Sequence, residues 1–163
     1  MNIVRSSLIA VICLAFSSVT RADDEEKVPL DKLPAKIKEA VKAKFPDAEL
    51  VSAEKEKEDG KILFEVNVKN KGKVVEITLT EDGKIVELET EITVADLPKA
   101  VTEAFEKKYP KATVTKVEEV IAGEKTKYEL LITFGEKKLE VSFDPKGAFI
   151  EEEDKSKEKD EKK

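Results

Sequence analysis

The chain has 163 residues, with 36 Asp and Glu against 30 Lys and Arg, a formal net charge of −6 and no His. Its single Cys and both Arg lie within the first 22 residues. The rest of the chain therefore lacks the usual ligands of zinc, haem and iron–sulfur clusters and the Cys and Ser–His nucleophiles. We assign no catalytic, cofactor-binding or metal-ligating residue. The acidic balance and the lack of Arg after residue 22 argue against nucleic acid as a partner.

Residues 1–22 are predicted to be an export signal. Arg5 supplies a positive start, residues 8–19 form a short apolar run, and Thr20-Arg21-Ala22 fits a cleavage site. The protein is therefore expected to be exported, to the periplasm or the extracellular space, with no membrane span after cleavage. Residues 23–32 form an N-terminal lead-in. Residues 155–163 are almost all Glu, Asp and Lys, which predicts a disordered charged tail.

Residues 33–90 and 97–154 are copies of each other at an offset of 64 residues, with 15 identities in 58 positions. The recurring groups are Leu33-Pro34 with Leu97-Pro98, Phe45-Pro46 with Tyr109-Pro110, and Phe64-Glu65-Val66 with Tyr128-Glu129-Leu130. Self-similarity at a fixed offset predicts a duplicated structural unit. Residues 91–96 are the linker between the two repeats, and we expect this short, half-apolar segment to hold them against each other.

Each repeat is expected to begin with a helix. In the first repeat, apolar residues fall at positions 33, 37, 40, 41 and 45, and the second repeats this spacing. Such spacing places the side chains on one face of a helix. Pro34 and Pro98 suit the first helical position. Pro46 and Pro110 are expected to end the helices, because the residue before a proline avoids helical backbone angles.

Four strands are expected after each helix. Apolar and polar residues alternate along most of these segments, and Gly-containing turns such as Asp82-Gly83 separate them, which favours antiparallel hairpins. The sequence therefore predicts an α+β fold of two tandem repeats, each one helix followed by a four-stranded antiparallel meander, with the helix packed on one sheet face. Whether the eight predicted strands form one sheet or two stays open.

The polar residues of these strands are predicted to form an exposed sheet face. They are Glu65, Asn67, Glu76, Thr78, Glu129, Thr133, Glu140 and Ser142. The recurring glutamates on this face suit Ca²⁺, which prefers carboxylate oxygens, or a basic partner. The interpretation that we favour is a solvated surface with cross-strand Lys–Glu pairs.

The repeated helix, the Phe/Tyr-Pro-x-Ala motif and the Glu-bearing strands behind an export signal resemble the PepSY-like proteins, and more narrowly the β-lactamase-inhibitor-like, PepSY-like family. The resemblance covers residues 33–154 and rests on the recurring groups above, with Phe45-Pro46-Asp47-Ala48 and Tyr109-Pro110-Lys111-Ala112. It implies exported, non-catalytic modules, some of which restrain peptidases or bind other extracytoplasmic proteins. It implies no defined set of functional residues.

The leading hypothesis is an exported, non-catalytic binding module whose partner is another extracytoplasmic protein. That partner is a secreted hydrolase of the peptidase or β-lactamase class if the module acts as an inhibitor or regulator. The alternatives are an acidic binder of Ca²⁺ or a small ligand, and a structural protein of the cell envelope.

Overall fold

A computed structural model describes residues 26–58 and 60–156. The predicted export signal, and the tail beyond Ser156, lie outside the described residues. Lys155 and Ser156, the first residues of the predicted tail, belong to the folded part, because the Lys155 N–H donates a hydrogen bond to the Lys138 carbonyl.

The two repeats have the same elements in the same order. The first contains α1 (Ala35–Lys44), β2 (Glu49–Glu58), β3 (Lys61–Asn70), β4 (Lys73–Thr80) and β5 (Ile85–Glu91). The second contains α2 (Lys99–Lys108), β6 (Thr113–Ala122), β7 (Lys125–Phe134), β8 (Lys137–Phe143) and β9 (Phe149–Asp154). The helix α2 begins 64 residues after α1, which matches the offset of the repeat in the sequence.

Proline marks both ends of the helices. Pro34 and Pro98 are the N-cap residues, one position before the helical start that was predicted for them. Phe45 and Tyr109 are the C-cap residues, so both helices end before Pro46 and Pro110 as predicted. A short 3₁₀ helix precedes each α-helix, η1 (Leu30–Lys32) and η2 (Val94–Asp96). At the start of η2, the N–H of the N-cap residue Thr93 donates a hydrogen bond to the Asp96 carboxylate, which orders the predicted linker.

All strands in the part of the chain that the structure describes belong to one antiparallel sheet, in the order β1 to β9. The two repeats join where β5 pairs with β6, from Leu88 opposite Ile121 to Glu91 opposite Glu118. Within the described residues the sheet has nine strands, so the predicted total of eight was wrong by one strand. The additional strand is β1 (Glu26–Lys27), which pairs with β2 and comes from the lead-in.

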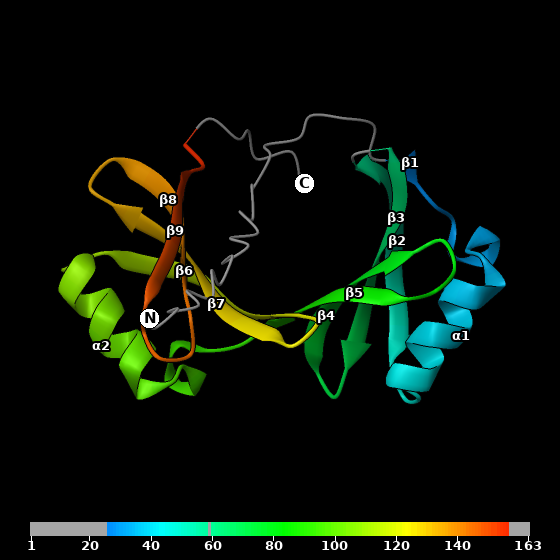
Figure 1. The fold of residues 1–163 in the computed structure, drawn as a ribbon, viewed down its shortest axis with the longest axis horizontal. Helices are drawn as coiled ribbons and strands as arrows, with labels where there is room; N and C mark the ends of the chain where they lie inside the picture. The colour runs from blue at the N-terminus through cyan, green and yellow to red at the C-terminus, as the bar shows by residue number, and fades with distance from the viewer. Residues whose placement is uncertain (1–25, 59, 157–163) are drawn as a thin grey trace, which may run out of the picture.

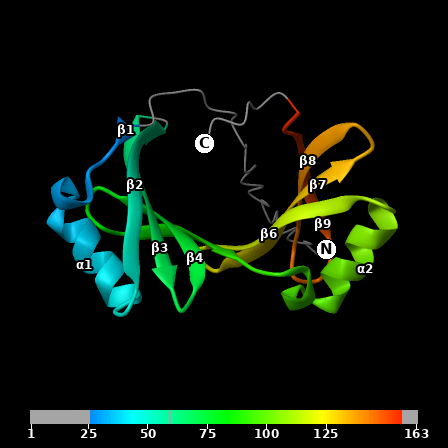
Figure 2. The same cartoon turned by 180° about the vertical axis from the view of Figure 1, so that it is seen from behind.

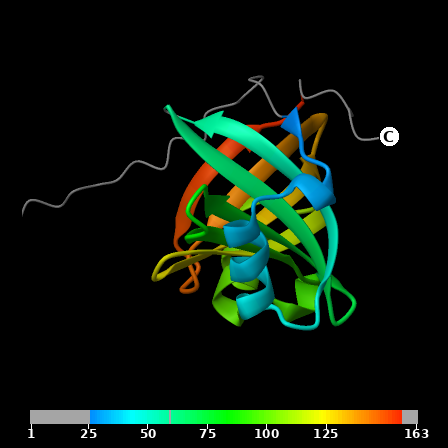
Figure 3. The same ribbon diagram turned by 90° about the vertical axis from the view of Figure 1, so that its right-hand side faces the viewer.

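Two separate cores lie between the helices and the sheet. Ile37 and Val41 of α1 pack against the first repeat's strands, and Val101 and Phe105 of α2 pack against the second's. Figures 1 and 2 show the helices on the outer side at opposite ends of the sheet, and Figure 3 shows how strongly the strands twist between them. No helix within the described residues is long and apolar enough to cross a membrane.

The second core includes Tyr109, which has a hydroxyl group that its counterpart in the first core, Phe45, lacks. Tyr109 is buried and its hydroxyl donates to the Glu152 carboxylate, with 2.5 Å between the oxygens. Tyr109→Phe is expected to lower the free energy of unfolding by about 1 kcal/mol, because this hydrogen bond is lost while the ring packing remains. Urea denaturation measures the change. Glu152→Gln, which keeps an acceptor, should cost less, and a Tyr109→Phe protein as stable as the wild type would contradict the prediction.

Candidate functional site

The side of the sheet that faces away from both helices carries most of the chain's half-buried charge. We call this side the open face. Because the helices cover the outer side at both ends, the open face lines the inside of the curved sheet (Figure 1). Its central residues, read from the strand register, are Glu65, Asn67, Glu76, Thr78, Glu87, Glu89, Lys116, Glu118, Val120, Lys127, Glu129, Leu131, Thr133, Glu140, Ser142, Glu151 and Glu153.

The structure places all eight residues of the predicted sheet face on the open face. They form two groups, one per repeat: Glu65 pairs with Thr78 and Asn67 with Glu76 in the first, and Glu129 pairs with Ser142 in the second, beside Thr133 and Glu140. Their exposure differs from the expectation. Thr133 is exposed, Ser142 is buried at 5% exposure, and the other six are half-buried.

Sequence reasoning missed the residues that join these two groups. Glu87 and Glu89 lie on β5, and Glu118 lies on β6, the two strands that pair between the repeats. A sequence signal for Glu87 and Glu89 was present, because they alternate with the partly buried Leu88 and so lie on the opposite face of β5. This alternation does not indicate that β5 pairs with β6.

Three carboxylates meet at the junction of the repeats, and we call them the glutamate cluster: Glu89, Glu118 and Glu129. Each offers one carboxylate oxygen, and these oxygens lie within 4.8 Å of one another. Lys116 contacts Glu118 at 2.7 Å and Lys127 contacts Glu129 at 2.5 Å, measured from nitrogen to oxygen. Two of the three carboxylates are therefore ion-paired.

Burial governs the protonation of the cluster. Together with the nearby negative charges of Glu76, Glu118 and Glu129, it raises the pKa of Glu89 to about 9. Burial also raises the pKa of Glu118, although the ion pair with Lys116 opposes this. Glu89 therefore keeps its proton at neutral pH, which lets three carboxyl groups lie this close together.

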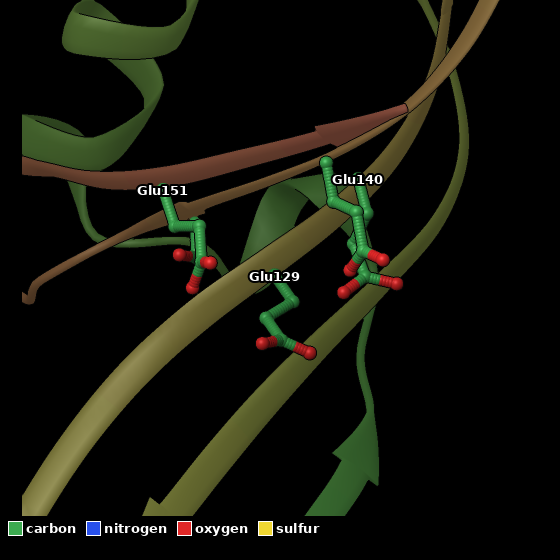
Figure 4. Close-up of a pocket in the computed structure, with 5 residues that line it drawn as sticks. Glu129, Glu140 and Glu151 are labelled. Atoms are coloured by element: carbon green, nitrogen blue, oxygen red, sulfur yellow. The ribbon is translucent and has the colours of Figure 1, made fainter. Parts of the chain in front are cut away.

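Two hollows adjoin the cluster. The larger is a groove of about 350 Å³, lined by Val120, Ala122, Lys125, Thr126, Lys127, Asp144, Ile150 and Glu151. The smaller, of about 10 Å³, is lined by Glu129, Glu140, Ser142, Glu151 and Glu153 (Figure 4) and has about the volume that one water needs. Oε1 of Glu153 is buried and has no hydrogen-bond partner within the described residues. The open face thus offers acidic side chains and an apolar groove close together.

The comparisons with known proteins identify the fold and the family. A BLIP-like protein from Bacteroides fragilis has a crystal structure with a TM-score of 0.67 and 22% identity, over 82% of this chain and 92% of that chain. A protein of an uncharacterised family from Bacteroides uniformis has a TM-score of 0.68 and 18% identity, over 77% of this chain and 92% of that one.

A third structure, a "putative periplasmic" protein from Bacteroides eggerthii, has a TM-score of 0.67 and 19% identity, over 76% of this chain and 89% of that chain. No curated protein matches the chain. The family described as "Putative beta-lactamase-inhibitor-like, PepSY-like" matches residues 22–87 and 64–151. These two segments span most of the chain, and the protein belongs to this PepSY-like family.

Proposed function

We propose that this protein is an exported, non-catalytic module that binds another extracytoplasmic protein on its open face. The observation that carries the proposal is the open face itself, where half-buried carboxylates and an apolar groove lie on one continuous nine-stranded sheet. A sheet of this kind is ordered before binding, so that little entropy is lost when a partner docks. The leader-like residues 1–22 and the described location of the Bacteroides eggerthii protein support export.

A secreted hydrolase is the partner class that the family description favours. The family is described as β-lactamase-inhibitor-like, and the Bacteroides fragilis structure as BLIP-like. Interface hot spots are enriched in Trp, Tyr and Arg, yet the central residues of the open face include none of these. The partner is therefore expected to supply the aromatic or cationic anchors, and this module the acidic and apolar sites that receive them.

Charge reversal on the open face tests the proposal. We expect Glu76→Lys, at a half-buried position on β4, to weaken partner binding at least tenfold, because it places a cation among carboxylates that face the partner. Proteins that the wild-type protein captures from the exported fraction are identified. The affinity of each captured protein is then measured for the wild type, for Glu76→Lys and for a control variant.

Glu103→Lys is the matched control, because Glu103 is exposed on α2 and lies on the helix side of the molecule. It should bind as the wild type does. Equal affinity of all three proteins, or loss of binding only with Glu103→Lys, would place the interface elsewhere and contradict the proposal.

A divalent cation is the second candidate ligand, favoured by the spacing of the glutamate cluster. Carboxylate oxygens within 4.8 Å of one another suit Ca²⁺. Lys116 and Lys127 compete for the same carboxylates. Calorimetry with CaCl₂ decides: Ca²⁺ binding gives heat and a raised melting temperature, both reduced by Glu118→Gln. The absence of both effects removes this candidate. A purely structural envelope protein binds neither Ca²⁺ nor a partner.

A further inference from the structure

The groove beside the glutamate cluster has an apolar floor and a charged rim. Val120, only 1% exposed, forms part of the floor, while Ile150, 46% exposed, lies at the side. Lys125, Lys127, Asp144 and Glu151 contribute charge around it. A volume of about 350 Å³ lies in the range of ligand pockets, and the sheet leaves it open to a protruding segment of a larger molecule.

The groove and the cluster share their neighbouring residues. Glu89 lies directly opposite Val120 across the β5–β6 pair, and Glu118 lies two residues before Val120 on the same face of β6. Residues two apart on a strand are separated by about 7 Å. An extended peptide places its residues i and i+2 at the same separation, so that two side chains of one such segment reach both the groove and the cluster.

The charge around the glutamate cluster and the apolar floor of the groove determine which side chain of a bound segment each one receives. The open face has six glutamates around the junction, Glu76, Glu87, Glu89, Glu118, Glu129 and Glu140. Three lysines contact members of this group: Lys116 contacts Glu118, Lys127 contacts Glu129 and Lys155 contacts Glu140. Because Glu89 holds its proton at neutral pH, five carboxylates remain against three lysines. This remaining excess favours a cation at the junction, where partial burial strengthens the attraction relative to bulk water. The apolar floor around Val120 favours an aliphatic or aromatic side chain.

We propose that the junction of the repeats is a docking site for an extended segment of the partner protein that carries a Lys or Arg and, two residues away, a large apolar side chain. The cationic group enters the glutamate cluster, and the apolar side chain fills the groove. This proposal rests on the proposed function, because it specifies what the open face recognises.

Selection from a random dodecapeptide phage library, with the full-length protein as bait, tests this pattern without a known partner. We expect enriched peptides to contain a basic residue and, two positions away, a large apolar residue. Synthetic peptides of the enriched sequences should bind at least tenfold more weakly to Glu118→Gln and to Ile150→Ser, and more weakly as NaCl concentration rises.

Two exposed positions provide matched controls. Glu103→Gln removes a carboxylate from α2, and Val94→Ser removes an aliphatic side chain that is 46% exposed, like Ile150. Both should bind the peptides within twofold of the wild type. Melting curves establish that all four variants are folded.

Failure of this inference is distinguishable from failure of the proposed function. Enriched peptides without the basic residue, peptides that bind Glu118→Gln and Ile150→Ser as well as the wild type, or no enrichment at all would overturn the docking site. The proposed function fails only if partner binding is also unaffected by Glu76→Lys.

Discussion

Gly147→Ala is expected to destabilise the protein by about 4 kcal/mol, through strain in its own backbone and a collision with α2. Gly147 has a φ of +82°, a left-handed conformation that residues with a Cβ rarely adopt. A Cβ there would lie 2.3 Å from the Ala100 carbonyl oxygen, and that oxygen is part of the helix backbone. The helix would have to move away from the β8–β9 turn, which would loosen the second core.

The equivalent residue of the first repeat, Gly83, is expected to tolerate alanine better. Its φ is +84°, and a Cβ there would lie 2.8 Å from the Lys36 carbonyl oxygen of α1. Gly72 is the control, because its φ is also +84° but a Cβ would meet nothing within 4 Å. Gly72→Ala should cost only the conformational strain, about 1 kcal/mol.

Urea denaturation of the three alanine variants gives the comparison. The expected order of loss in free energy of unfolding is Gly147→Ala, then Gly83→Ala, then Gly72→Ala. Equal losses at all three positions would show that the backbone conformation alone matters and that neither helix touches its turn as described.

The local elements of this fold could be predicted because their signals lie in short stretches of sequence. Proline before and after an apolar stripe locates each helix, and alternation in residues 62–69 and their copies locates the central strands. The strand β1 could not be predicted in the same way. It has only two residues, Glu26 and Lys27, which are too few to show a period, and it exists only because β2 offers a free edge.

The glutamate cluster could be predicted only in part. Alternation places Glu129 on the side away from the helix, but Glu89 and Glu118 reach it through the pairing of β5 with β6, which no local pattern specifies. The face was also predicted to be exposed throughout, whereas most of its residues are half-buried. Ser142 lies between Glu129 and Glu151 in the register of the sheet, and it is buried.

Glu89→Gln is expected to stabilise the protein by several kcal/mol at pH 8 and by much less at pH 5. The pKa of Glu89 is about 9 in the folded protein, against an ordinary value of 4.5. Between these values the folded state holds a proton that the unfolded state releases, so the free energy of unfolding falls as pH rises. The contribution is fully present below pH 4.5 and is lost as pH approaches 9. Glutamine resembles the protonated side chain at every pH and removes this loss.

Other groups of the open face act in the same direction. Burial raises the pKa of Glu87, Glu118 and Glu140, so each also favours the folded state at lower pH. Asp82 and Asp96 act oppositely, because hydrogen bonds lower the pKa of each and their contribution is lost only below about pH 4. The stability of the wild-type protein should therefore be highest on the acid side of neutrality.

Urea denaturation at pH 5, 6.5 and 8 tests this dependence. The wild-type protein should lose stability steadily across the series, Glu89→Gln should lose less, and Glu103→Gln, at an exposed position on α2, should follow the wild type. A wild-type protein that is equally stable at pH 5 and pH 8 would mean that Glu89 ionises normally. Within residues 26–58 and 60–156, the cluster would then hold three charged carboxylates beside two ion-paired lysines, Lys116 and Lys127, and it would attract a cation more strongly.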